Sequence, residues 1–196
     1  MKPLEEIYGP KFFAKRKSLS WRAKPVCEAI NSVLEPESVI DVGCAIGDYV
    51  QYWRNSLGVY AMGIEGSKAA CPYFVCDGIV VSDLRQKINV WLRADLVVSF
   101  EVFEHIELEY TDQFLINLTK MSDKILASAA AIGQGGHYHV NCQPREYWIE
   151  KMEGLKYKYD NHIVLAVQEL WKPWKGKKEM SSYYHNLLFF QKEANE

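Results

Sequence analysis

Side chains that can bind a metal ion or transfer a proton are concentrated in two short stretches of this sequence. Glu101, Glu104 and His105 fall within the segment EVFEHI. His137 and His139 follow in the Gly-rich segment GQGGHYHVN. Two carboxylates and two imidazoles suit a divalent ion, whereas a histidine, with a reference pKa of about 6.5, suits proton transfer. Both interpretations stay open at this point.

The two interpretations assign the residues differently. For metal-free proton transfer, we favour His105 as the general base, with His139 second and Glu104 beside them. For a metal site, the candidate set is Glu101, Glu104, His105 and His137.

Small residues follow an apolar run in VIDVGCAIGDYV, residues 39–50. Asp41, Gly43, Cys44 and Gly47 give the pattern D-x-G-C-x-x-G. Glycine at such positions lets a ligand approach the backbone closely. A nicotinamide dinucleotide site needs G-x-G-x-x-G, but positions 43, 45 and 48 are Gly, Ala and Asp, which excludes that fingerprint.

Apolar segments typical of strands alternate with segments of helical spacing. We expect helices over residues 20–35, 48–55, 111–121 and 143–155. We expect strands in SVIDVG, VYAMGIEG, GIVVSDL, DLVVSFEV, KILASAAA, HIVLAVQEL and YYHNLLFFQK. The last two would form an antiparallel hairpin around the loop WKPWKGKKEMSS. This pattern predicts an α/β fold: a doubly wound, Rossmann-like, seven-stranded and mostly parallel sheet with helices on both faces.

No linker divides the 196 residues, so we expect one domain. Residues 1–36 would form a helical lid or cap, and residues 37–196 the core. The aromatic side chains Tyr8, Phe12 and Phe13 precede the core. They could either fold over a ligand site, as lids do, or cover a sheet edge.

The sequence resembles the class I S-adenosylmethionine-dependent methyltransferases. Residues 41–47, DVGCAIG, match the family's first motif D-V-G-C-G-x-G except at Ala45, and EVFEHI resembles its fourth-strand block. The resemblance implies that Glu65 contacts the ribose and that Asp83 lies near the adenine. It covers residues 37–131 well and residues 132–196 in architecture. The implied cofactor site comprises Asp41, Gly43, Cys44, Ala45, Gly47, Glu65, Gly66, Asp83, Phe100 and Glu101.

The resemblance implies methyl transfer from S-adenosylmethionine, and we favour an oxygen of a small molecule as the acceptor. The small-RNA 2′-O-methyltransferases carry a similar E-x-x-E-H…H set that binds a metal, so metal-assisted RNA 2′-O-methylation is the alternative. A degenerate, non-catalytic binding protein is a third hypothesis, motivated by Ala45. A positive φ there would cost roughly 1–2 kcal/mol and weaken cofactor binding about tenfold.

Composition and charge limit the classes of substrate and binding partner that we expect. A formal net charge of −2 gives no overall attraction to nucleic acid, which favours a small-molecule acceptor. The five cysteines form no C-x-x-C pair, as expected for reduced thiols. We find neither a signal-peptide pattern nor an apolar stretch of membrane-spanning length and expect a cytoplasmic protein. Lysines and tryptophans in residues 171–178 could bind phosphates or a membrane interface, but we favour a solvated loop.

Overall fold

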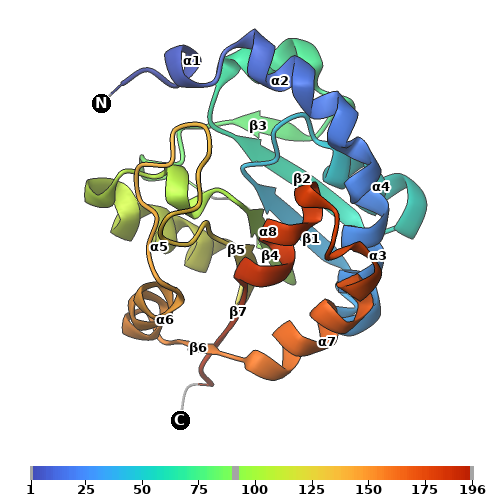
Figure 1. The fold of residues 1–196 in the computed structure, drawn as a ribbon, viewed down its shortest axis with the longest axis vertical. Coiled ribbons are helices and arrows are strands. Elements are labelled where there is room, and N and C mark those ends of the chain that lie inside the picture. Colours follow the sequence, from blue (N-terminus) through green and yellow to red (C-terminus); the bar gives the residue numbers. More distant parts are fainter. Residues whose placement is uncertain (1, 90–92, 195–196) are drawn as a thin grey trace.

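The computed structural model describes residues 2–89 and 93–194, which contain one mixed β-sheet (Figure 1). Its seven strands have the order β3-β2-β1-β4-β5-β7-β6. Neighbours from β3 to β5 run parallel, whereas β7 runs antiparallel to both β5 and β6. The strands are β1 (Ser38–Val42), β2 (Tyr60–Glu65), β3 (Ile79–Val81), β4 (Leu96–Phe100), β5 (Lys124–Ser128), β6 (Tyr157–Tyr159) and β7 (Leu187–Lys192). The predicted doubly wound, mostly parallel sheet is confirmed.

Helices cover both faces of the sheet because successive strand residues point to opposite sides. Val39 of β1 packs in one core with α3 (Ala23–Leu34), α4 (Asp48–Leu57), α7 (Asn161–Trp171) and α8 (Lys178–Asn186). Ile40, the next residue, packs in a second core with α5 (Thr111–Met121) and α6 (Arg145–Gly154). The bounds of α5 agree with the predicted helix over residues 111–121.

The N-terminal segment, residues 2–16, contains α1 (Leu4–Ile7) and α2 (Pro10–Arg16). Phe13 of α2 is buried against Ile46, in the loop after β1, and Ala70, in the segment after β2. These segments follow the carboxyl ends of parallel strands, where open α/β sheets bind their ligands. The N-terminal segment therefore lies over the edge of the sheet at which a site is expected.

The prediction of a strand in HIVLAVQEL was wrong, because residues 161–171 form the helix α7. Asp160 caps this helix, its side chain accepting hydrogen bonds from the backbone N–H groups of His162 and Ile163. Val164, Val167 and Trp171 are buried at helical spacing. The antiparallel strand pairs at this end of the sheet consist instead of β7 with β5 and with β6.

The predicted loop WKPWKGKKEMSS is also largely helical. A 3₁₀ helix, η5 (Lys172–Trp174), is followed by α8, which begins at Lys178. Trp171 belongs to the core and is 0% exposed. It is therefore not available to bind a nucleic acid base or a membrane surface.

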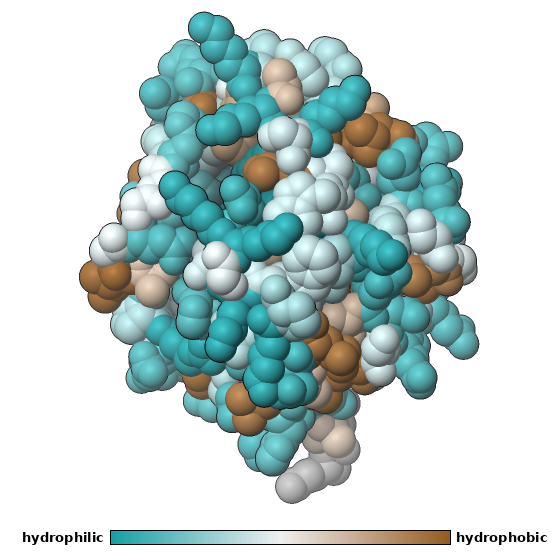
Figure 2. Space-filling view, turned by 45° about the vertical axis from the view of Figure 1, so that its right-hand side comes forward, coloured by the Kyte–Doolittle hydropathy of each residue, from teal (hydrophilic) through white to brown (hydrophobic). Residues whose placement is uncertain are grey.

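None of the described helices is long and apolar enough to cross a membrane. In the view of Figure 2, hydrophilic side chains dominate the surface and hydrophobic ones form small separate groups. Scattered apolar side chains of this kind are normal on a folded domain.

Candidate cofactor and acceptor site

The loop after β1 has three residues in the left-handed backbone region. Gly43, Ala45 and Gly47 have φ values of 80°, 51° and 81°. A Cβ on Gly43 would lie 2.4 Å from Cγ2 of Val102, and one on Gly47 would lie 2.4 Å from Cδ1 of Ile79. Both glycines are therefore required by conformation and by space, whereas Ala45 adopts its positive φ at an energetic cost.

Glu65 joins this loop to the end of β2. Its Oε2 atom accepts a hydrogen bond from the backbone N–H of Ala45 at 3.0 Å, and its Oε1 atom accepts one from Ser67 at 2.9 Å. Glu65 is 8% exposed. Burial raises the pKa of Glu65 to about 7, against the opposing effect of these backbone hydrogen bonds. Each carboxylate oxygen keeps acceptor capacity for a further donor.

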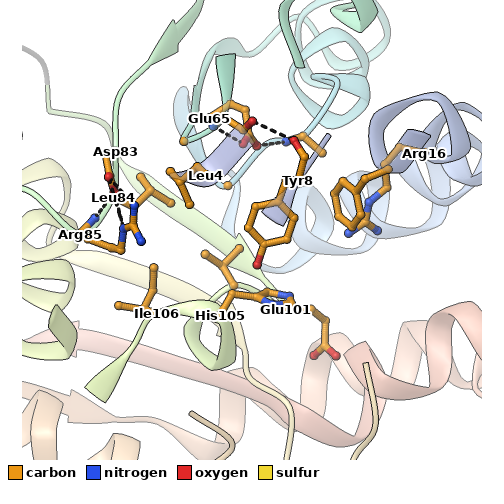
Figure 3. A pocket seen from close by; sticks show the side chains of 16 residues that line it. Leu4, Tyr8, Arg16, Glu65, Asp83, Leu84, Arg85, Glu101, His105 and Ile106 are labelled. Carbon is orange, nitrogen blue, oxygen red and sulfur yellow. Dashed lines mark hydrogen bonds and ion pairs between the residues drawn. The ribbon is translucent and has the colours of Figure 1, made fainter. Parts of the chain in front are cut away.

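These residues line a pocket whose empty space, open solvent at its mouth included, is about 600 Å³. Its walls come from the loop after β1, the end of β2, Asp83 to Arg85, four residues after β4 and the N-terminal segment; the four are Glu101, Val102, His105 and Ile106. Figure 3 shows Glu65 and Tyr8 near the middle, with Asp83 and Arg16 on opposite sides.

Asp83 lines the pocket, but its carboxylate is already held by Arg85. Nη2 of Arg85 donates to Oδ2 of Asp83 at 2.8 Å, and Nε donates to Oδ1 at 3.0 Å. Nη1 of Arg85 binds Oε1 of Glu107 and the carbonyl oxygen of Lys2, both at 3.1 Å. Arg85 was not among the predicted site residues; the only signal for it in the sequence is an arginine two residues after the strand-end acid Asp83. This buried side chain connects the pocket wall to the N-terminal segment.

Glu104, His105 and His139 converge behind the pocket. Oε1 of Glu104 lies 3.9 Å from Nε2 of His105 and 3.8 Å from Nε2 of His139. Glu104 is 0% exposed, and neither of its carboxylate oxygens has a hydrogen-bond partner among the described residues. The three residues could each offer one ligand atom to a metal ion, with all ligand atoms within 4.8 Å of one another.

The tautomers of the two histidines follow from their neighbours. Nδ1 of His105 lies 3.0 Å from the carbonyl oxygen of Tyr138, and Nδ1 of His139 lies 3.0 Å from that of Gln134. A carbonyl oxygen can only accept, so each Nδ1 carries the proton and each neutral ring has a lone pair on Nε2. Burial lowers the pKa of His105 to about 4 and raises that of Glu104, with the nearby charge of Glu101 adding to the second shift.

Glu101 and His137, two members of the predicted metal set, have other partners. Oε1 of Glu101 accepts a hydrogen bond from Ser128 at 2.8 Å, and Oε2 accepts one from Gln134 at 2.8 Å. Nε2 of His137 lies 2.6 Å from the carbonyl oxygen of Ile7 in the N-terminal segment. The structure thus places His139, rather than His137, beside Glu104 and His105.

A second hollow adjoins the pocket and is lined by further predicted cofactor residues. Asp41, Cys44 and Phe100 line it. The ring of Phe100 stacks on that of Tyr183 with centroids 5.1 Å apart. Burial raises the pKa of the Cys44 thiol, which makes it a packed side chain rather than a nucleophile.

The N-terminal segment is fastened over the pocket from several sides. The carbonyl oxygen of Tyr8 accepts a hydrogen bond from Oγ of Ser67 at 3.0 Å. The Tyr8 ring lies 5.7 Å from that of His105, edge to face. Its hydroxyl oxygen is buried and has no hydrogen-bond partner among the described residues. The segment therefore forms one wall of the pocket.

No family model matches the sequence, and no curated protein matches it. The fold matches solved structures at low sequence identity. The plantazolicin methyltransferase BpumL, crystallised with a desmethyl analogue and SAH, has a TM-score of 0.62 at 13% identity, over 97% of this chain and 94% of that chain. The complex of the Haloferax volcanii Trm112 methyltransferase activator with the protein named there as "the putative methyltransferase" gives a TM-score of 0.63 at 14% identity, over 95% of this chain and 97% of that chain. The [4+2]-cyclase SpnF has a TM-score of 0.58 at 10% identity, over 86% of this chain and 80% of that chain. The chain has the class I methyltransferase fold.

Proposed function

We propose that this chain, which has the class I methyltransferase fold, transfers a methyl group from S-adenosylmethionine to an oxygen atom of a small molecule. The observation that carries the proposal is the position of Glu65. This buried carboxylate follows β2, holds the Gly43–Gly47 loop through the N–H of Ala45, and faces the pocket. A carboxylate there can accept hydrogen bonds from ribose hydroxyls.

The residues present fit an adenosyl group. Gly43 and Gly66 line the pocket beside Glu65, where a Cβ would lie 2.4 Å from Cγ2 of Val102 and 2.9 Å from Cδ1 of Leu4, so these walls pack directly on the backbone. Leu84 gives an apolar wall next to Asp83. Because Arg85 already occupies the Asp83 carboxylate, we assign Asp83 to shaping the adenine end rather than to a sole polar contact with it.

When bound, S-adenosylmethionine supplies a methyl group on a positively charged sulfur, and transfer requires close alignment with the acceptor. His105 would take the proton from an acceptor hydroxyl on Nε2, since its Nδ1–H is engaged by Tyr138. Glu104, 3.9 Å away, would stabilise the protonated ring in its ionised form, which its raised pKa makes the major form above about pH 8. His139 offers a second Nε2 on the other side of the same carboxylate.

Calorimetry with S-adenosylhomocysteine tests the cofactor assignment. We expect micromolar binding to the wild-type chain and at least tenfold weaker binding to Glu65→Gln, because one ionic acceptor is replaced by a neutral amide. Glu37→Gln, at an exposed position before β1, is the matched control and should bind normally. Absence of binding at millimolar concentration would overturn the proposal and favour a non-catalytic protein.

A metal-assisted reaction is the second candidate, and the unpartnered Glu104 carboxylate favours it. One carboxylate and two neutral imidazoles, each fixed by a backbone carbonyl, form a donor set suited to Mn²⁺, Co²⁺ or Zn²⁺. An ion bound there would polarise an acceptor oxygen. The alternative RNA substrate has no support from the net charge of −2.

Cobalt titration distinguishes the two candidates without an acceptor. Metal assistance predicts that Co²⁺ gives a visible absorption spectrum with the wild-type chain and none with His139→Ala. His137→Ala should keep the spectrum. If wild type and His139→Ala behave alike, the metal-free mechanism is retained.

A further inference from the structure

A groove between α3 and the segment after α7 is lined by aromatic and basic side chains. Its walls include Trp21 and Lys24 on one side and Trp174 and Lys177 on the other. None of these four residues lines the pocket at Glu65 or the second hollow. The groove is therefore a separate surface feature, and the proposed methyl transfer does not use it.

The two indole rings lie together in this groove. The ring centroids of Trp21 and Trp174 are 5.7 Å apart, and the ring planes are tilted by 38°. Nζ of Lys177 lies 4.7 Å from the Trp21 centroid and 5.0 Å from the Trp174 centroid. Trp21 is 36% exposed, and the Lys177 side chain is exposed as well. Because a contact between an exposed cation and an aromatic ring is weak, another group can replace Lys177 on the two indoles.

The fold brings to the groove a tryptophan that is distant in the sequence. Trp171, close to Trp174 in the sequence, is buried in the core, and Trp21 lies beside Trp174 instead. Figure 1 shows the red segment between α7 and α8 next to α3. Nε1 of Trp171 donates to the carbonyl oxygen of Pro25 at 3.1 Å, which holds the two walls of the groove together. The groove is thus formed before any ligand binds.

The net charge of −2 conceals an uneven distribution of charge. Residues 15–28 and 169–179, which include the walls of the groove, contain nine of the chain's 23 basic side chains but only three of its 25 acidic ones. Lys172 pairs with Glu169. Six further lysines there are exposed and make no ion pair with any described residue; they are Lys15, Lys17, Lys24, Lys175, Lys177 and Lys178. The side of the molecule that carries the groove is therefore locally positive.

These features suit single-stranded nucleic acid. Its bases are planar and stack on aromatic side chains, and its phosphates pair with ammonium groups. A membrane surface takes up apolar side chains that protrude from a protein, whereas Trp21 and Trp174 line a groove and contact each other. Glu28 also lines the groove, but its carboxylate already accepts a hydrogen bond from the hydroxyl of Tyr52 at 2.8 Å.

We propose that the groove binds single-stranded nucleic acid, with bases stacked on Trp21 and Trp174 and phosphates held by Lys24 and Lys177. Lys177 moves from the indoles to a phosphate when a base takes its place. The nucleic acid is bound at this surface and not in the pocket at Glu65. The net charge of the whole chain does not oppose this binding, because phosphates respond to charges within a Debye length of roughly 8–10 Å.

Fluorescence anisotropy on the full chain, with fluorescein-labelled oligo(dT) of about 12 nucleotides, tests the stacking contacts. We expect binding at low salt that weakens as salt rises, with log K falling by roughly 0.7 per unit of log salt for each phosphate contacted. Trp21→Ala and Trp174→Ala should each weaken binding by at least about fivefold and keep this salt dependence. Tyr60→Ala, at a 64% exposed position in β2, is the matched aromatic control and should bind as wild type does.

The lysine variants should change the salt dependence instead. Lys24→Gln removes one phosphate contact and should reduce the slope by about 0.7. Lys120→Gln makes the same change at an exposed position on α5, which covers the opposite face of the sheet, and should leave the slope unchanged. An unchanged slope in Lys24→Gln would overturn the assignment of its phosphate contact.

Other outcomes would overturn the proposal as a whole. Failure of wild type to bind at low salt, or equal binding by wild type and both tryptophan variants, excludes a stacking site. Equally strong competition by inorganic polyphosphate would show that the surface attracts any polyanion. Cosedimentation with phosphatidylserine vesicles, without binding of oligo(dT), would identify a membrane surface instead.

Two further measurements keep these results interpretable. Calorimetry with S-adenosylhomocysteine should give the same affinity for wild type and Trp174→Ala, so a failure of this proposal is distinguishable from a failure of the proposed function. Thermal unfolding shows whether each variant is folded. If a tryptophan variant is unfolded, Lys24→Glu, at an exposed position, replaces it: this variant should weaken binding more than Lys24→Gln does, and equal binding by the two would overturn the proposal.

Discussion

The backbone N–H of Ala45 donates a 3.0 Å hydrogen bond to Oε2 of Glu65, while Ala45 has a φ of 51°. The acid proposed to bind the ribose is thus held by a residue in a strained conformation. The same hydrogen bond would form with glycine, which adopts this φ without strain. Ala45 therefore stores strain without supplying a contact that glycine could not make.

Replacing Ala45 with glycine should stabilise the fold. Relief of roughly 1–2 kcal/mol of strain exceeds the cost of glycine's extra freedom in the unfolded chain, roughly 0.5–1 kcal/mol. We expect urea denaturation to show a gain of up to about 1 kcal/mol. Ala61→Gly, in β2 at a buried position with ordinary backbone, should lower stability. A loss of stability in Ala45→Gly would contradict the strain argument.

Replacing the ionisable carboxyl group of Glu104 should change how the free energy of unfolding depends on pH. Burial raises the pKa of Glu104, so the folded state keeps a proton that the unfolded state releases. This contribution is full below the unfolded pKa of about 4.5 and is lost as pH rises to about 8, so it lowers the free energy of unfolding across that window. Glu65, with a pKa raised to about 7, adds to the fall between about pH 4.5 and 7. Glu104→Gln should reduce the slope measured by urea denaturation in metal-free buffer.

His105 contributes the opposite slope at acid pH. Its pKa is lowered to about 4, so between pH 4 and 6.5 the unfolded state binds more protons at this ring, which offsets part of the fall due to Glu104 and Glu65. Glu104→Gln keeps the ring and removes one of the two falling contributions, so its stability should change little between pH 4.5 and 6.5. A fall in Glu104→Gln as steep as that of wild type between pH 4.5 and 8 would contradict the assignment to Glu104.

Asp83→Asn tests whether Arg85 depends on its carboxylate partner. The Arg85 side chain is 3% exposed, and removing a partner from a largely buried pair typically costs several kcal/mol. Because Glu107 remains, we expect a loss of about 1–3 kcal/mol in denaturation experiments. Asp77→Asn makes the same change in the exposed pair with Arg54 and should cost at most about 1 kcal/mol. Similar losses at both positions would show that burial of Arg85 does not matter.

His137→Ala should release the N-terminal segment. The 2.6 Å contact between Nε2 of His137 and the carbonyl oxygen of Ile7 is one of its fastenings. Losing it should raise the exchange rate of amides in residues 2–16 severalfold, since one hydrogen bond contributes about 1 kcal/mol. His162→Ala, at an exposed position on α7, should leave those amides unchanged. Unchanged exchange in His137→Ala would assign closure to the other contacts alone.

The fold could be predicted where local spacing and tertiary packing agree. The spacing of Phe114, Leu115 and Leu118 predicts α5, and these residues are buried in the structure. The strand prediction for residues 162–170 was wrong because β-branched Ile163, Val164 and Val167 favour a strand on propensity alone. Their buried spacing and the Asp160 cap favoured the helix that forms.

The sequence predicted which segments form the site, but it could not decide between two histidines that lie close together in the sequence. His137 and His139 are two residues apart, and nothing in the sequence indicates which one faces Glu104. The backbone decides, with Tyr138 between them at a φ of 56°. Arg16 and Arg85 were missed because a charged residue is ordinarily expected at the surface, and only the fold shows that the Arg16 Nε atom and the Arg85 side chain are enclosed.

The position of β7 constrains how the chain can fold during its synthesis. This strand is the last of the described strands in sequence, yet it lies inside the sheet between β5 and β6. Until β7 leaves the ribosome, β5 has an open edge and β6 has no strand to pair with. An exposed strand edge invites pairing with other chains. The nascent protein should therefore depend most on protection from aggregation just before residues 187–192 emerge.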